Sequence, residues 1–143
     1  MAFWTPEKPF NSGESLYFSY DLKTVEQNPF VSELASVVRT RQGKAVLPGD
    51  EFKDDSLNNT RQFSVDFSAP QSLSFDEKSM KLVVQGANGA ISKQRLYPVA
   101  DGQEWRATFF VKPNEKQTVD MRAYIEQDGQ RVSEVWNYVY QPN

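Results

Sequence analysis

The chain has 143 residues, a length typical of a single domain, and it carries a formal net charge of −3. It contains no cysteine and no histidine, which excludes disulfides, a thiol nucleophile, Ser-His-Asp catalysis and the common zinc sites. The mildly acidic balance argues against a nucleic-acid partner, and no apolar run is long enough to predict a membrane span.

The chain opens with two large aromatic residues, Phe3 and Trp4, before a stretch that contains Pro6 and Pro9. Chain ends are usually polar and poorly ordered unless something holds them in place. We therefore expect a module of a larger protein, in which the two aromatic side chains lie in a first strand or against a neighbour outside this sequence. Residues 1–143 are predicted to form one domain.

Alternation of apolar and polar residues with a period of two predicts β-strands along most of the chain. In chain order, the predicted strands cover residues 16–22, 34–41, 63–67, 80–85, 91–99, 105–111, 119–126 and 130–140. Asn88-Gly89 and Asp128-Gly129 are predicted to be two-residue hairpin turns, and Trp105 and Trp136 fall on the inward phase of their strands. The pattern predicts an all-β fold, an immunoglobulin-like β-sandwich of about eight antiparallel strands. A β-barrel is the rival that alternation alone does not separate.

The connection over residues 43–59 contains an acidic cluster formed by Asp50, Glu51, Asp54 and Asp55. Spaced carboxylates are the ligands that Ca²⁺ prefers, but this cluster lacks the pattern of a calcium-binding loop and is interrupted by Lys53. We expect a solvated loop here, and we predict neither a metal nor a cofactor.

Three carboxylates stand out on the predicted strands. Asp66 and Asp120 fall on the outward phase, where solvated carboxylates are expected. Glu134 shares its phase with Trp136, so we expect it to be partly buried and paired, with Arg106 or Arg122 as the partner. A glycosidase that uses Asp66 with Glu134 is the enzymatic alternative, since such enzymes need two carboxylates across a cleft.

Tyr17, Tyr97, Tyr124 and Phe110 fall on the opposite phase from the main apolar residues of their strands. Exposed aromatic rings can stack on sugar rings, so these residues are candidates for carbohydrate binding. The alternative is that both faces of these strands are covered, or that the rings support an interface between domains.

A set of short motifs occurs in a fixed order from one end of the chain to the other. They are Phe3-Trp4-x-Pro6-Glu7, Phe18-x-Tyr20-x-Leu22, Val65-Asp66-Phe67, Trp105-Arg106, Met121-Arg122-Ala123 and Ser133-Glu134-x-Trp136-x-Tyr138. Together they resemble the C-terminal domain of the periplasmic glucan biosynthesis proteins, OpgG (also called MdoG) and its paralogue OpgD. The resemblance leaves the choice between the two paralogues open.

The resemblance implies a smaller immunoglobulin-like domain that follows a large N-terminal β-sandwich in an exported, periplasmic protein. That protein takes part in making osmoregulated periplasmic glucans with a β-1,2-linked glucose backbone. The catalytic residues are expected on the N-terminal domain, so this chain is expected to be a non-catalytic accessory domain. Its expected partners are that catalytic domain and, further, β-glucan and the membrane glucan synthase. A carbohydrate-binding module that holds the glucan is the alternative.

The resemblance also suggests roles for individual positions. Trp4 and Glu7 would lie at the junction where the chain leaves the larger domain. Arg106, Arg122 and Glu134 would form a polar network that locks strands together or faces the neighbouring domain.

Overall fold

The computed structural model describes residues 9, 11–25, 33–46, 57–70, 72–74, 76–99, 102 and 104–142. The chain divides into two compact units, Met1–Phe30 and Val31–Asn143, and the eight strands found among the described residues all lie in the second unit. Trp4, Glu7 and the acidic cluster at residues 50–55 lie outside the described residues.

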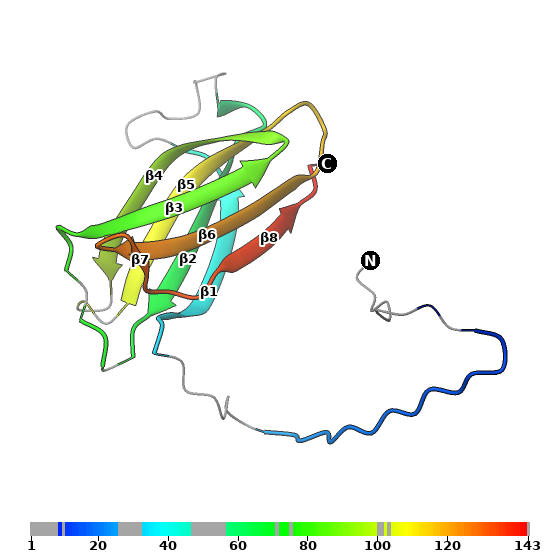
Figure 1. Ribbon diagram of the computed structural model, residues 1–143. Coiled ribbons are helices and arrows are strands. Elements are labelled where there is room, and N and C mark those ends of the chain that lie inside the picture. The colour runs from blue at the N-terminus through cyan, green and yellow to red at the C-terminus, as the bar shows by residue number, and fades with distance from the viewer. Residues whose placement is uncertain are drawn as a thin grey trace. The chain divides into compact units, whose positions relative to one another are not determined.

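The second unit is a sandwich of two antiparallel four-stranded sheets (Figure 1). The first sheet has the strand order β1-β2-β5-β4; in the second sheet, β6 pairs with β3, β7 and β8. The strands are β1 (Ser36–Lys44), β2 (Arg61–Ser68), β3 (Met80–Ala87), β4 (Gly89–Val99), β5 (Glu104–Pro113), β6 (Val119–Gln127), β7 (Gln130–Arg131) and β8 (Trp136–Tyr140). The predicted all-β, immunoglobulin-like sandwich is confirmed.

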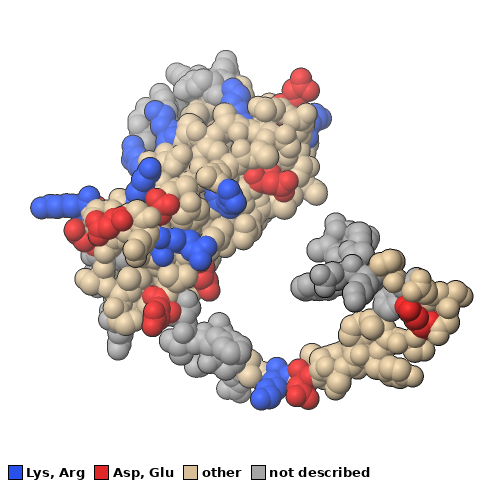
Figure 2. Space-filling view, in the orientation of Figure 1, with Lys and Arg blue, Asp and Glu red and all other residues tan. Residues whose placement is uncertain are grey.

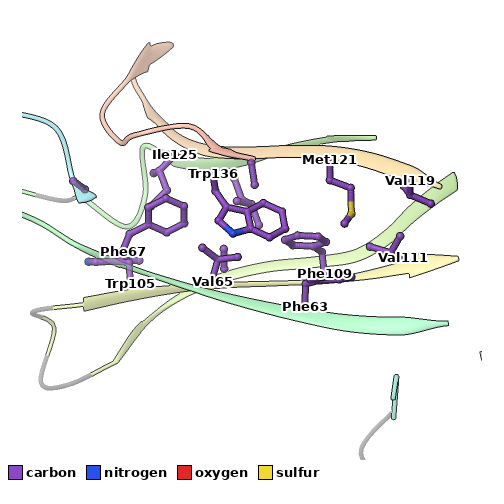
Figure 3. Close-up of a cluster of buried hydrophobic side chains, with 14 residues drawn as sticks. Phe63, Val65, Phe67, Trp105, Phe109, Val111, Val119, Met121, Ile125 and Trp136 are labelled. Carbon is purple, nitrogen blue, oxygen red and sulfur yellow. The ribbon is translucent and has the colours of Figure 1, made fainter. Parts of the chain in front are cut away.

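Aromatic side chains from both sheets fill the space between them (Figure 3). Phe63 of β2 stacks on Phe109 of β5 at 5.7 Å between ring centroids, and Trp136 of β8 meets both rings edge-on. The indole N–H of Trp136 donates a hydrogen bond to the hydroxyl of Thr40 at 2.9 Å. Trp105 and Trp136 are both buried, as their inward phase predicted. Aromatic pairs in these geometries stabilise a core beyond their buried area.

Seven of the predicted strands form, and the last of them is divided between β7 and β8. The strand predicted over residues 16–22 does not form, although its alternation is as regular as that of β2. A strand requires a hydrogen-bonded neighbour as well as a pattern, and among the described residues no backbone hydrogen bond reaches this segment.

The two predicted hairpin turns have different outcomes. Asp128-Gly129 joins β6 to β7 with positive φ at both positions, so that prediction is confirmed. The prediction of a hairpin at Asn88-Gly89 is wrong, because β3 and β4 belong to different sheets and Asn88 connects them. A Cβ at Gly89 would lie 3.1 Å from the Val119 side chain and 3.2 Å from the backbone carbonyl oxygen of Lys112, so the close approach at this crossing favours glycine.

Candidate functional site

The outer face of the first sheet carries the strongest concentration of interacting polar side chains among the described residues. Backbone register aligns four side chains in one row across all four strands, in the order Arg39, Asp66, Arg106 and Tyr97. The next row contains Arg41, Ser64, Thr108 and Arg95, in the same strand order. Because alternate residues of a strand point to the same side, each row continues the surface formed by the one before.

Asp66 lies at the centre of this surface and is almost completely buried, with 1% of its side chain exposed. Arg106 on β5 binds it through two hydrogen bonds, Nε to Oδ1 at 2.6 Å and Nη2 to Oδ2 at 2.9 Å. From β1, Arg39 donates to Oδ2 at 3.1 Å, and the Nη1 atom of Arg41 lies 3.6 Å from the same oxygen. The carboxylate therefore joins three neighbouring strands.

These contacts also fix the charge states in the cluster. The hydrogen bond from Arg106, reinforced by the charges of Arg106, Arg39 and Arg41, holds the pKa of Asp66 below its usual range against the opposing effect of burial. The pKa of Arg106 is raised, mainly by its hydrogen bond to Asp66. A carboxylate held ionised by arginines is poorly suited to act as a general acid. With 1% of its side chain exposed, Asp66 is also covered from any substrate that it could attack as a nucleophile.

The expectation that Asp66 is a solvated carboxylate is therefore wrong. Its position on the outward phase is as predicted, but arginines on both neighbouring strands cover it and replace water. The available sequence signal was Arg39-x-Arg41 on one predicted strand together with Arg106 on the outward phase of another. Asp120, on the outward phase of β6, is exposed as expected.

A pocket of about 640 Å³ adjoins the charged rows on the same outer face. Its described lining residues are Val46, Gln62, Lys93, Arg95, Leu96, Tyr97, Thr108 and Phe110. The lining combines two aromatic rings with two cations and an amide, and no carboxylate occurs among these described residues. Pockets of this size hold small ligands when a few polar groups converge on an apolar wall.

A β-bulge in β4 shapes the rim of this pocket. In a regular ladder, the residues opposite Phe110 and Thr108 would be two apart in sequence, but here they are Ser92 and Arg95, three apart. The bulge contains Lys93, whose φ of 52° lies in the left-handed region that side-chain-bearing residues rarely adopt. The extra residue adds the Lys93 side chain to the pocket lining.

The three tyrosines proposed for sugar binding do not share one surface. Tyr17 lies in the first unit and is 91% exposed. Tyr97 lies on β4 beside the pocket, whereas Tyr124 lies on β6 in the second sheet, opposite Val83. Tyr97 therefore lines this pocket together with Phe110, which is itself buried.

Arg106, Arg122 and Glu134 each have a different partner. Arg106 binds Asp66, and the Nε atom of Arg122 donates to the side-chain oxygen of Gln85 at 2.6 Å. Glu134 is exposed, and its carboxylate accepts a hydrogen bond from the backbone N–H of Val37 at 3.1 Å. No ion pair joins the three within the described part of the chain.

Glu134 belongs instead to a clamp that holds the start of β1. Backbone hydrogen bonds of 2.8 Å connect Ala35 to Val132 and to Glu134 on either side of buried Ser133. The Ser133 hydroxyl accepts from the N–H of Ile125 and donates to the carbonyl of Glu134. The clamp joins the start of β1 in the first sheet to the connection between β7 and β8 in the second sheet.

The second sheet has a different surface. Figure 2 shows basic and acidic side chains interspersed over the side of the sandwich that carries β3 and β6. No group of acidic residues close enough to hold a metal ion occurs within the described ranges. In the same ranges, no helix is both long and apolar enough to cross a membrane.

Comparison with known proteins places these features in a family context. The sequence model of the family described as "Periplasmic glucan biosynthesis protein, MdoG" matches residues 1–140. The chain is 31% identical to "Glucans biosynthesis protein D" of Enterobacter sp. (strain 638) and 30% identical to "Glucans biosynthesis protein D 2" of Ralstonia nicotianae. Each match covers 99% of this chain and 26% of the relative, so the chain spans about a quarter of the length of these relatives.

Proposed function

Because the chain belongs to the MdoG family of periplasmic glucan biosynthesis proteins, we propose that it is a non-catalytic accessory domain in the synthesis of osmoregulated periplasmic glucans. Its place of action is the periplasm, and the glucan has a β-1,2-linked backbone. The domain supports the catalytic part of the same protein. The membrane glucan synthase is a further candidate partner.

The observation that carries this proposal is the state of Asp66. Among the described residues, Asp66 is the one carboxylate that is buried, and arginines from the neighbouring strands β1 and β5 bind it. A glycosidase that paired it with Glu134 would need one of the two groups protonated as the acid. The lowered pKa of Asp66 opposes that role, and Glu134 is occupied with the backbone of Val37. The geometry therefore supports a structural use of both carboxylates.

Incubation of the chain with a β-1,2-linked glucan tests the non-catalytic part of the proposal. We expect no new reducing ends over the incubation, with either the parent chain or Glu134→Gln. Cleavage by the parent chain that disappears in Glu134→Gln would replace the proposal with the enzymatic alternative.

A second candidate function, glucan binding, is favoured by the pocket beside Tyr97. Tyr97 is 38% exposed, and Gln62, Arg95 and Thr108 line the same pocket and carry hydrogen-bonding groups. Sugar sites combine a flat aromatic surface with polar groups of this kind. Titration with β-1,2-linked gluco-oligosaccharides, followed by amide NMR shifts, would then perturb β4 and β5 and spare β3.

Tyr97→Ala provides the matched test of this second function, with Tyr124→Ala on the opposite sheet as the control. Binding that is lost in the first variant and kept in the second supports the pocket. An absence of shifts at millimolar sugar leaves the accessory role without direct contact to glucan.

A further inference from the structure

Residues 15–25 have the pattern of a β-strand but belong to none of the eight strands. Apolar side chains occupy alternate positions at Leu16, Phe18, Tyr20 and Leu22, and between 51% and 88% of each is exposed. Tyr17, Ser19 and Asp21 lie between them, and Lys23 follows; Tyr17 is 91% exposed and is the one aromatic residue on this other side. Soluble proteins rarely leave a contiguous apolar set of this kind uncovered.

The alternation specifies what would cover the segment. One side of the segment is entirely apolar, and the other is polar except for Tyr17. This is the pattern of an antiparallel strand with a core on one face and water on the other. Such a strand also needs a neighbour for its backbone N–H and C=O groups. Among the described residues, no backbone hydrogen bond involves residues 15–25, so both requirements are unmet.

The chain immediately before the segment is a poor source of that neighbour. A turn at Asn11–Glu14 precedes the segment. The Glu14 N–H donates a hydrogen bond to the Asn11 carbonyl, and the Glu14 carboxylate accepts hydrogen bonds from the backbone and side-chain amides of Asn11. The sequence before this turn contains Pro6 and Pro9, which cannot donate to a ladder. A unit of 30 residues is also below the roughly 40 residues needed for an independent core.

We propose that residues 15–25 form a strand of a second β-sheet, and that the neighbouring strand comes from the part of a full-length family protein that lies outside this chain. The family match over residues 1–140 includes the segment. The chain spans 26% of the length of the matched relatives, so most of such a protein is available to supply the sheet. Leu16, Phe18, Tyr20 and Leu22 would face the core of that sheet, with Ser19 and Asp21 toward solvent.

This inference rests on family membership and goes beyond the proposed accessory function. It divides residues 1–143 differently from the single domain predicted from the sequence. The sandwich begins at the clamped Ala35, and the preceding strand belongs to another sheet. The accessory domain would then be joined to the rest of the protein by a shared strand as well as by a linker.

Amide hydrogen exchange tests the proposal by comparing this chain alone with a longer protein. The longer protein is the Enterobacter relative in which the matching quarter has been replaced by this chain. We expect the amides of residues 15–25 to exchange at least about a hundredfold more slowly in the longer protein, as paired strands do, and near the unpaired rate in the chain alone. The aligned segment of the unmodified relative provides a second measurement if the hybrid does not fold.

Phe18→Asp and Ser19→Asp form a matched pair, because they add the same charge on opposite sides of the proposed strand. Phe18→Asp should abolish the protection of residues 15–25 in the hybrid while the amides of β6 stay protected. Ser19→Asp should keep it.

Three results would overturn the proposal. The first is equal protection in the chain alone, which would mean that the segment pairs with its own sandwich or with a second copy. The second is the absence of protection both in the hybrid and in the unmodified relative. The third is the same response of the hybrid to both substitutions.

Discussion

Replacing Asp66 with asparagine keeps the size of the side chain but removes the negative charge on which Arg39, Arg41 and Arg106 converge. Breaking a buried ion pair by removing one partner typically costs about 3–5 kcal/mol, because the remaining charges are left without compensation. Here Arg106 is 27% exposed and Arg39 is 45% exposed, so water partly solvates the remaining cations. We therefore expect Asp66→Asn to lower the free energy of unfolding by about 2–3 kcal/mol.

Urea denaturation followed by tryptophan fluorescence measures this change, since Trp105 and Trp136 are both buried in the sandwich. The midpoint should fall while the dependence on urea stays the same, as expected for a pure loss of stability. Asp120→Asn is the matched control, because Asp120 is an exposed aspartate on the outward phase of β6. A surface substitution of this kind should change stability by less than about 0.5 kcal/mol.

The same experiment can refute the reasoning. If Asp66→Asn and Asp120→Asn have equal effects, Asp66 does not join the strands as its contacts indicate. Arg106→Gln, alone and combined with Asp66→Asn, isolates the pair: a double-mutant cycle should give a coupling energy of at least about 1 kcal/mol.

Three further predictions concern stability. The pKa of Asp66 is lower in the folded state than in the unfolded state, so ionised Asp66 stabilises the fold above about pH 4. This contribution is lost as pH falls through the lowered pKa. The loss of stability on acidification should therefore be less steep in Asp66→Asn than in the parent chain. Ser133→Ala should cost about 1–3 kcal/mol in urea unfolding, because it leaves a buried N–H without an acceptor, and a smaller loss would mean that water replaces the hydroxyl. Gly89→Ala should lower the melting temperature through a clash with Val119, at a cost of about 1–3 kcal/mol. Gly43→Ala, which meets no atom within 4 Å, should be neutral or slightly stabilising, and equal effects of the two substitutions would contradict the crossing geometry.

The sandwich could be predicted from the sequence because strand alternation and turn residues are signals contained in short stretches of chain. Alternation in β2 and β5 is enough to assign Phe63, Phe109 and Trp105 to the core without knowledge of their neighbours. The turn at Asp128-Gly129 is likewise encoded by two adjacent residues that tolerate positive φ.

The errors all concern pairing between distant segments. Asp66 is bound by residues 27 and 40 positions away, and only the register of the sheet brings them opposite one another. Asn88-Gly89 has the composition of a hairpin, but the sheet to which β4 belongs is decided by β5. The segment 16–22 has the pattern of a strand without a neighbour among the described residues. The pocket beside Tyr97 also depends on register, together with a bulge that alternation does not reveal.

The most direct test of the accessory role is glucan production in a bacterial strain that lacks its own glucans biosynthesis proteins. The strain would receive this chain alone with an export signal, the hybrid of this chain with the Enterobacter relative, or the relative without its matching quarter. The account predicts that periplasmic glucan returns with the hybrid, stays absent with the chain alone, and is reduced with the shortened relative. Glucan restored by the chain alone would contradict the accessory role, as would full production by the shortened relative.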